Sequence, residues 1–342
     1  MRKPITIAID AMGGDHGPSV TVPAALNIIK KYPGVALILV GDHDTLNTQL
    51  LKLKSGISDQ LSIHHASQTV EMDELPSHAM RNKKDSSMRV SLNLVKEGLA
   101  DACVSAGNTG ALMATARFVL KMLPGIDRPA ICSELPTITG HTLMLDLGAN
   151  VDSSADHIFE FAVMGSVLCS AIDGIKNPTV GVLNIGEEEI KGNERVKEAA
   201  RLIGESKLNY IGFIEGNDIF KGDTNVVVCD GFIGNIALKS SEGLAMMFSH
   251  FLKQEFKRSP LSLLSALIAM PVLHSLKKKF DPGHYNGASL LGLQGITIKS
   301  HGGADANAFV RAIEVAIMEV RNEVPQRISE QLENMLEKET TV

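Results

Sequence analysis

The chain of 342 residues is 44% hydrophobic, which is enough to bury a full core in one large α/β unit. Its 33 lysine and arginine residues against 39 acidic residues give a formal charge of −6, which argues against nucleic acid as a partner. Because the four cysteines form no Cys-x-x-Cys pair, and neither a signal peptide nor an apolar run of about 18 residues is present, we expect a reduced, cytoplasmic protein without a zinc site or a transmembrane span.

Six stretches share one pattern, in which an apolar strand ends in a polar residue, a glycine-containing loop follows, and a helix comes next. The strands are predicted at Ile5–Asp10, Ala102–Ser105, Thr142–Asp146, Val180–Asn184, Val226–Asp230 and Ile296–Ser300. Such repetition predicts an open α/β sheet, in which ligands bind beyond the carboxyl ends of parallel strands. We expect the six polar loops to meet on one rim of a single unit over residues 1–342, with room for two lobes around a cleft.

The loop after the first strand carries Asp10, Asp15 and His16, ahead of a helix predicted from Pro18 to Tyr32. Two acids and a histidine so close together could bind a metal, act as acid and base, or satisfy a glycine-rich turn. We keep Asp10 and His16 as candidates for catalysis.

A second strand at Val35–Gly41 and a helix at Asp44–Lys54 are predicted next, followed by a basic stretch that runs into a helix capped by Asp85 or Ser86. A charge run of this kind is a solvated surface or a cationic lip for a phosphate or an acidic partner. Lys84 is our candidate from this stretch.

The segment Ser105-Ala-Gly-Asn-Thr-Gly110 links a buried strand to a helix predicted at Gly110–Leu123. Its two glycines remove side chains where a ligand would approach the backbone, and its asparagine and threonine add short polar groups at a helix N-terminus. We interpret it as an anion cradle, with an ordinary strand-to-helix turn as the alternative.

The second half of the chain repeats these signals. Further strands are predicted at Ala130–Leu135 and Tyr210–Glu215, helices at Ala155–Gly174, Gly234–Gln254 and Asp305–Val324, and a glycine-rich loop at Tyr285–Leu293. Asp152 and Ser153 are the expected caps of the helix at 155–174. Three consecutive carboxylates precede Lys191 in the loop 184–194, which is either solvated charge or the support of a positioned lysine.

Several motifs are missing. The sequence has no Gly-x-Gly pair, no Gly-Lys-Ser/Thr, no Gly-x-Ser-x-Gly and no His-Glu-x-x-His, which argues against nucleotide-dependent enzymes, serine hydrolases and zinc proteases. The remaining chemistry uses backbone donors, a few lysines and loop acids. This set favours transfer to or from a phosphate-like anion.

Five motifs carry a resemblance to a known family. They are Asp10-Ala-Met-Gly-Gly-Asp-His-Gly-Pro18, Ser105-Ala-Gly-Asn-Thr-Gly110, Leu145-Asp-Leu-Gly-Ala-Asn150, Asn184-Ile-Gly-Glu-Glu-Glu-Ile-Lys-Gly-Asn-Glu194 and Cys229-Asp-Gly-Phe-Ile-Gly-Asn235. In this order the chain resembles the bacterial acyl-carrier-protein:phosphate acyltransferases of phospholipid synthesis, as far as Ser300-His-Gly302. Ser289 stands where the family pattern has proline.

The resemblance implies a three-layer α/β/α fold like that of phosphotransacetylase and isocitrate dehydrogenase, and a homodimer without a cofactor or a bound metal. It implies transfer of a fatty acyl group from acyl carrier protein to inorganic phosphate, giving acyl phosphate for a membrane acyltransferase. We assign phosphate or substrate binding to Ser105, Gly107, Asn108, Thr109, Gly110, Lys84 and Lys239. Catalysis is assigned to Asp10, His16, Lys191, Asn193, Asp230, Asn235 and His301.

Three rival hypotheses remain. An acyl-cysteine route would use Cys103 or Cys229, although both end apolar strands and have no obvious histidine partner. A metal-dependent hydroxyacid dehydrogenase of related fold would need a nucleotide site and clustered carboxylates. A non-catalytic scaffold for lipid or carrier protein would show no phosphate-dependent release of thiol.

The segment 258–280 departs from the α/β pattern. Leu264, Leu267 or Ile268, and Leu273 recur at helical spacing, and Pro271 is expected to divide two short helices that are too short to span a bilayer. Basic residues bracket the apolar stretch, as in amphipathic segments that lie on anionic lipid. We expect a protruding amphipathic segment that places the protein peripherally on the inner face of the cell membrane, with helices packed inside a dimer as the alternative.

Overall fold

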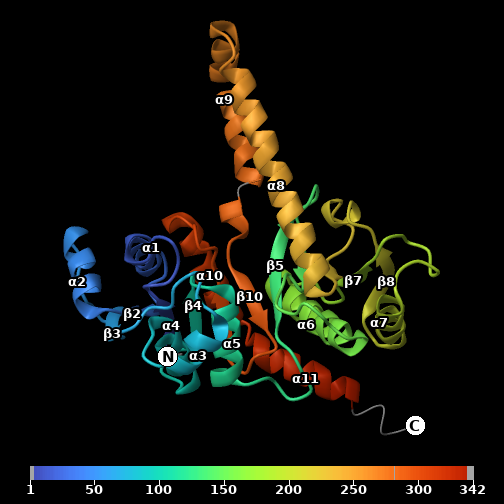
Figure 1. Cartoon of the computed structure of the whole chain (residues 1–342), viewed down its shortest axis with the longest axis horizontal. Coiled ribbons are helices and arrows are strands. Elements are labelled where there is room, and N and C mark those ends of the chain that lie inside the picture. Colours follow the sequence, from blue (N-terminus) through green and yellow to red (C-terminus); the bar gives the residue numbers. More distant parts are fainter. Residues whose placement is uncertain (1–3, 281, 337–342) are drawn as a thin grey trace.

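The computed structural model describes residues 4–280 and 282–336, and its centre is an 11-stranded sheet (Figure 1). The strand order is β3-β2-β1-β4-β11-β10-β5-β6-β9-β7-β8. The strands are β1 (Ile5–Asp10), β2 (Val35–Gly41), β3 (Leu61–His65), β4 (Ala102–Ser105), β5 (Ala130–Pro136), β6 (His141–Leu145), β7 (Thr179–Leu183), β8 (Asn209–Ile214), β9 (Val226–Val228), β10 (Ala288–Leu291) and β11 (Ile296–Lys299).

Helices cover both faces of this sheet, so the predicted α/β/α architecture with a mainly parallel sheet is confirmed (Figure 1). The helices are α1 (Pro18–Lys31), α2 (His43–Lys52), α3 (Pro76–Asn82), α4 (Ser87–Lys96), α5 (Thr109–Leu120), α6 (Ala155–Asp173), α7 (Glu194–Glu205), α8 (Gly231–Phe256), α9 (Pro260–Phe280), α10 (Ala306–Arg321) and α11 (Val324–Leu336). Two 3₁₀ turns lie at Asp218–Phe220 and Pro282–Tyr285.

The sheet contains two parallel blocks that run in opposite directions. Strands β3, β2, β1, β4 and β11 are mutually parallel, as are β6, β9, β7 and β8, whereas β10 is antiparallel to both β11 and β5, and β5 is antiparallel to β6. The loops that follow the strands of the first block therefore lie at one end of the strands of the sheet, and the loops that follow the strands of the second block lie at the other end. The expectation that all six polar loops meet on one rim is wrong.

The reversal depends on β10, which the sequence predicted as a loop. Its residues Ser289 and Leu290 pair with Cys132 and Ile131 of β5, and Ala288 and Ser289 pair with Lys299 and Ile298 of β11. The glycines on both sides of this short strand favoured the prediction of a loop, because Gly287 and Gly292, both with positive φ, turn the chain directly before and after it. The prediction of a loop at Tyr285–Leu293 is wrong over Ala288–Leu291.

The helix boundaries follow capping side chains. Ser86 caps α4 as predicted, accepting a hydrogen bond from the N–H of Arg89, whereas α6 is capped by Ser154 rather than by Asp152 or Ser153. Helix α8 begins at Gly231, three residues before the predicted start, because the side chain of Asp230 accepts a hydrogen bond from the N–H of Ile233.

Helix α6 is the central helix of the larger core cluster. Phe161, Ala162, Val163 and Met164 are fully buried there against strands of the second block. By length and composition α6 is the one helix in the described part of the chain that could cross a membrane, and most of its apolar window is buried inside the protein.

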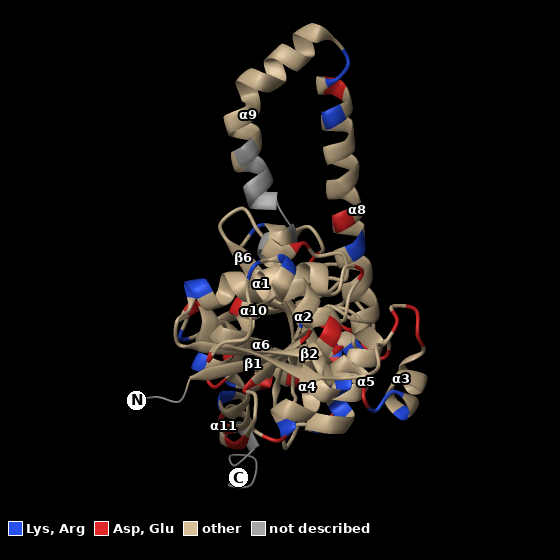
Figure 2. Ribbon diagram, turned by 90° about the vertical axis from the view of Figure 1, so that its left-hand side faces the viewer, with Lys and Arg blue, Asp and Glu red and all other residues tan. Residues whose placement is uncertain are grey.

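Helices α8 and α9 form a hairpin that extends far beyond the sheet (Figures 1 and 2). Contrary to prediction, α9 is one helix that runs through Pro271, and Figure 2 shows it bent along its length. The exposed fractions of Leu264, Leu267 and Ile268 are 55%, 59% and 76%, and Leu273 is half-buried. The hairpin therefore presents an apolar surface with no covering inside the described part of this chain.

Candidate active site

The first polar cluster lies at the carboxyl ends of β1, β4 and β11. Asp10 is buried, and one of its carboxylate oxygens accepts a hydrogen bond of 2.6 Å from the Ser105 hydroxyl. The Ser105 hydroxyl also accepts a hydrogen bond from the N–H of Gly107. The other carboxylate oxygen, Oδ1, has no hydrogen-bond partner among the described residues. Burial raises the pKa of Asp10 from its ordinary value, and the hydrogen bond from Ser105 opposes that rise.

Lys299 is a member of this cluster that sequence reasoning missed. It is only 8% exposed, and its ammonium group donates to the carbonyl oxygens of Ser300 and, at 3.4 Å, of Ala106. Burial lowers the pKa of Lys299 to about 8, although the nearby charge of Asp10 opposes the change. A buried ammonium group thus lies directly beside the turn that the sequence identified as an anion cradle.

The glycines of that turn serve packing rather than ligand approach. A Cβ added to Gly107 would lie 2.8 Å from Met88 Cε, and one added to Gly110 would lie 2.9 Å from Pro76 Cγ, so side-chain atoms of the protein pack against the Cα of each glycine. Asn108 caps α5 by accepting from the N–H of Ala111. The N–H groups of exposed Thr109 and of Gly110 lie in the first turn of α5, where a helix offers them no carbonyl partner. They are the backbone donors that this turn offers to a ligand.

The histidines of the first cluster lie at its surface. His301 is exposed, and its Nδ1 accepts from the N–H of Gly303 at 3.1 Å. His16 is also exposed on the loop before α1, whereas Asp10 is buried, so the structure does not join His16 to Asp10 by a hydrogen bond. Lys84 is exposed on the turn between α3 and α4, where its neighbour Lys83 binds Glu74 at 2.7 Å.

The second polar cluster lies at the carboxyl ends of β6, β7 and β9, on the opposite edge of the sheet. Asn193 and Asp230 cap α7 and α8. Arg195, which sequence reasoning did not select, links this cluster because its guanidinium binds Asp152 at 2.6 Å and Asp230 at 3.4 Å. The predicted residues Asn193 and Asp230 are thus brought together, but away from the predicted residues Asp10 and Ser105.

Asp146 is the centre of the second cluster. It is fully buried and accepts hydrogen bonds from the N–H groups of Ile131, Ala149 and Asn150, and from the side chain of Asn150. The first turn of α8 packs on it so closely that a Cβ at Gly231 would lie 2.6 Å from Asp146 Oδ2. Asp146 and Asn150 therefore form a rigid wall, and the Asp146 carboxylate is too enclosed to act as a general base.

The other predicted residues of the second block lie around this wall. Asn235 packs against Gly148, whose added Cβ would lie 3.2 Å from Asn235 Cβ. Lys191 is exposed at the end of the acidic loop, and Lys239 is exposed on α8. Neither lysine side chain forms an ion pair within residues 4–280 and 282–336, so both ammonium groups are available to an anion.

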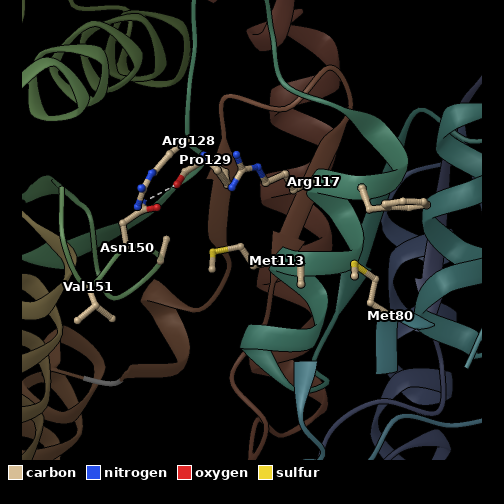
Figure 3. Close-up of a pocket in the computed structure, with 10 residues that line it drawn as sticks. Met80, Met113, Arg117, Arg128, Pro129, Asn150 and Val151 are labelled. Carbon is tan, nitrogen blue, oxygen red and sulfur yellow. Dashed lines mark hydrogen bonds between the residues drawn. The ribbon is translucent and has the colours of Figure 1, made fainter. Parts of the chain in front are cut away.

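A pocket of about 560 Å³ lies between α5 and the loops that precede β5 and follow β6 (Figure 3). It is lined by Met80, Met113, Ala114, Arg117, Phe118, Arg128, Pro129, Ala149, Asn150 and Val151. Arg117 extends from α5 toward Pro129, while Arg128 lies beside Asn150 on the facing wall (Figure 3). Its size is that of a small-molecule site.

All four cysteines are buried. Burial raises the pKa of Cys103, Cys132 and Cys229 well above the ordinary value, and raises that of Cys169 to about 12. A thiol is nucleophilic as its thiolate, so this environment disfavours an acyl-cysteine intermediate.

The fold is that of phosphotransacetylases. A phosphotransacetylase from Streptococcus pyogenes aligns with a TM-score of 0.66 at 18% identity, covering 94% of this chain and 95% of the other. A 4-hydroxythreonine-4-phosphate dehydrogenase from Klebsiella pneumoniae also aligns, with a TM-score of 0.54 at 14% identity over 92% of this chain and 99% of the other. The fold alone therefore does not separate the transferase from the dehydrogenase hypothesis.

Comparison with relatives in sequence distinguishes the transferase hypothesis from the dehydrogenase hypothesis. Residues 5–327 match the family described as "Fatty acid synthesis protein", and the chain belongs to this family. A phosphate acyltransferase from Nitrosococcus oceani is 62% identical over 332 residues, covering 97% of this chain and 98% of the relative. One from Legionella pneumophila is 57% identical over 335 residues, at 98% coverage of both chains. The resemblance and the assignment to the acyltransferases are confirmed.

Proposed function

We propose that this protein transfers a fatty acyl group from the thioester of an acyl carrier protein to inorganic phosphate, giving acyl phosphate for phospholipid synthesis. The observation that carries the proposal is the buried ammonium of Lys299, which lies 3.4 Å from the carbonyl oxygen of Ala106, directly before the turn that leads into the N-terminus of α5. A phosphate ion held there meets positive charge and backbone donors together.

The reaction needs placement more than acid or base strength. A phosphate oxygen attacks the thioester carbonyl carbon; a C–O bond forms as the C–S bond breaks, and the thiolate leaves and takes a proton from solvent. Phosphate is largely ionised near neutral pH and a thiolate is a good leaving group, so cations and oxyanion donors supply most of what is required. The high pKa values of the buried thiols favour this direct attack over an acyl-cysteine.

The purified protein tests the proposal. Incubated with acyl carrier protein thioester, it should release thiol only when phosphate is present, and it should hold no hydroxylamine-sensitive acyl group when phosphate is omitted. Release of thiol at the same rate without phosphate would contradict the proposed reaction. Absence of release under both conditions would favour a non-catalytic scaffold.

We further propose that the α8–α9 hairpin rests on the cytoplasmic face of the membrane, where a membrane acyltransferase would use the product. The support is the row of exposed Leu264, Leu267 and Ile268, next to Lys257 and Arg258 in the turn between the two helices. The side chains of 277–279, also expected at lipid headgroups, lie outside the described residues. The variant carrying Leu264→Glu and Leu267→Glu should fail to float with anionic vesicles while keeping the wild-type melting temperature.

The rival explanation for this apolar surface is the homodimer that the resemblance implies. Sedimentation of the same double variant distinguishes the two. A change from dimer to monomer would assign the leucines to the subunit interface and overturn the membrane proposal, whereas an unchanged dimer that no longer floats supports it.

A further inference from the structure

The pocket between α5 and the β6–α6 loop is positively charged. Two guanidinium groups line it, those of Arg117 and Arg128, and no acidic side chain does. Neither group forms an ion pair within the described ranges 4–280 and 282–336, and Arg128 donates a long hydrogen bond of 3.4 Å to the carbonyl oxygen of Asp152. In a chain with an excess of acidic residues, two arginines without carboxylate partners are available to bind an anion.

Two further cations lie beside Phe118, which lines the pocket. Phe118 is 52% exposed, and the guanidinium carbon of Arg89 and the ammonium of Lys121 lie 4.9 Å and 5.0 Å from its ring centroid. Cation–π contact at these distances orients the ring and keeps both charges beside it. These two charges add to those of Arg117 and Arg128 near the pocket, which favours the approach of an anion.

The rest of the lining is apolar and adaptable. Met80 and Met113 project from α3 and α5, and Val151 and Pro129 face them from the other wall (Figure 3). Methionine has a flexible, polarizable side chain that accommodates aliphatic groups of different shape. A free inorganic anion would gain nothing from these side chains, so the lining indicates a ligand with an aliphatic part.

One wall of the pocket is held rigidly in place. Asn150 donates from its side chain to the Pro129 carbonyl at 2.8 Å and to buried Asp146 at 2.9 Å, which links the loops that carry Arg128 and Val151. A site whose walls are fixed before binding loses less entropy when the ligand enters. The hydrogen bonds of Asn150 thus fix the relative positions of the two loops that form this wall.

We infer that this pocket binds a phosphate group that carries an aliphatic chain, with Arg117 and Arg128 on the phosphate and the methionines along the chain. The inference rests on the proposed function, which offers two ligands of this chemistry. One is the acyl phosphate product after it leaves the turn at the N-terminus of α5, and the other is the phosphate-linked thiol arm by which a carrier protein presents its acyl group.

Binding of three probes to the resting protein tests the inference without turnover. Decylphosphonate represents the product, 4′-phosphopantetheine represents the carrier arm, and methylphosphonate lacks the chain. By calorimetry, wild-type protein should bind a chain-bearing probe more tightly than methylphosphonate. Arg117→Gln and Arg128→Gln should each weaken that binding on the order of ten- to a hundredfold, the range for a lost charge-assisted hydrogen bond. Met113→Asp should weaken the binding of decylphosphonate much more than the binding of methylphosphonate.

Arg201→Gln is the matched control, because Arg201 is an exposed arginine on α7 that pairs with Glu198 and Glu205 outside the pocket. It should bind all probes as the wild type does. Loss of decylphosphonate binding alone in the pocket variants assigns the site to the product, and loss of phosphopantetheine binding alone assigns it to the carrier arm. Wild-type affinity for both probes in both arginine variants, with thermal melting unchanged, would overturn the inference even if phosphate-dependent thiol release is intact.

Discussion

Glu319 offers a sharp test of the electrostatics of this fold. It lies on α10, is 2% exposed, and its carboxylate accepts a hydrogen bond from Ser289 of β10. Burial raises the pKa of Glu319 from 4.5 to about 7, while the Ser289 hydrogen bond opposes the rise. Because the folded protein holds this proton more tightly than the unfolded chain, the stabilisation from Glu319 is present below about pH 4.5 and is lost as the pH rises through about 7.

The magnitude follows from the two pKa values. A tenfold difference in proton affinity is worth about 1.4 kcal/mol, so the rise from 4.5 to about 7 corresponds to a loss of about 3 kcal/mol on full ionisation. Glu319→Gln keeps the shape and an oxygen that accepts from Ser289 but does not ionise. Its free energy of unfolding should exceed that of the wild type by about 3 kcal/mol near pH 8, and the excess should shrink to a few tenths near pH 4.5.

Urea unfolding at the two pH values measures this difference. Glu314→Gln on the same helix is the control of opposite sign: although burial opposes the change, hydrogen bonds from Lys31, Arg311 and Tyr32 lower the pKa of Glu314. Removing that carboxylate should therefore destabilise the protein near neutral pH. A Glu319→Gln variant that is no more stable than the wild type near pH 8, or whose excess does not depend on pH, would refute the reasoning.

Three further predictions concern the candidate site. Lys299→Met should raise the KM for phosphate on the order of tenfold or more, because a charge-assisted contact is lost, and initial rates against phosphate concentration measure this; a wild-type KM would remove Lys299 from the site. Lys191→Ala should also weaken saturation by phosphate while circular dichroism stays unchanged, and normal phosphate kinetics would refute its assignment. Gly107→Ala should lower the melting temperature, because its Cβ would lie 2.8 Å from Met88 Cε; an unchanged melting temperature would show that Met88 moves aside without cost.

Several polar residues that sequence reasoning assigned to catalysis or binding turn out to hold helix ends. Asn108, Asn193 and Asp230 each follow a strand and precede a helix, and each accepts a hydrogen bond from an N–H in the first turn of that helix. A short side chain with an oxygen is the best N-cap and also a good ligand for an incoming donor. Sequence patterns alone do not distinguish the two roles, because both need the same residue type at the same place.

The residues that sequence reasoning missed lack any local signal. Lys299 belongs to a strand, yet its neighbours Asp10 and Ala106 come from distant parts of the chain. Arg117 lies within the helix predicted at Gly110–Leu123 and Arg128 lies just before the strand predicted at Ala130–Leu135, and their relation depends on how the two blocks of the sheet meet. By contrast, strands that end in a polar residue were well predicted, because a buried apolar run followed by a glycine-rich loop has few other structures available.

Helix α5 provides the physical link between the phosphate turn and the pocket. Thr109, Met113 and Arg117 follow one another at intervals of four residues, so they lie along neighbouring positions of one helix face. At 1.5 Å per residue the eight residues from Thr109 to Arg117 span about 12 Å, a distance that an extended acyl or pantetheine chain covers. A phosphate bound at the N-terminus of α5 and a chain-bearing phosphate bound at Arg117 could therefore occupy the same helix at once. If the phosphate at Arg117 is that of the carrier arm, the arm would carry its thioester toward the turn, where attack by the first phosphate would be favoured by position alone.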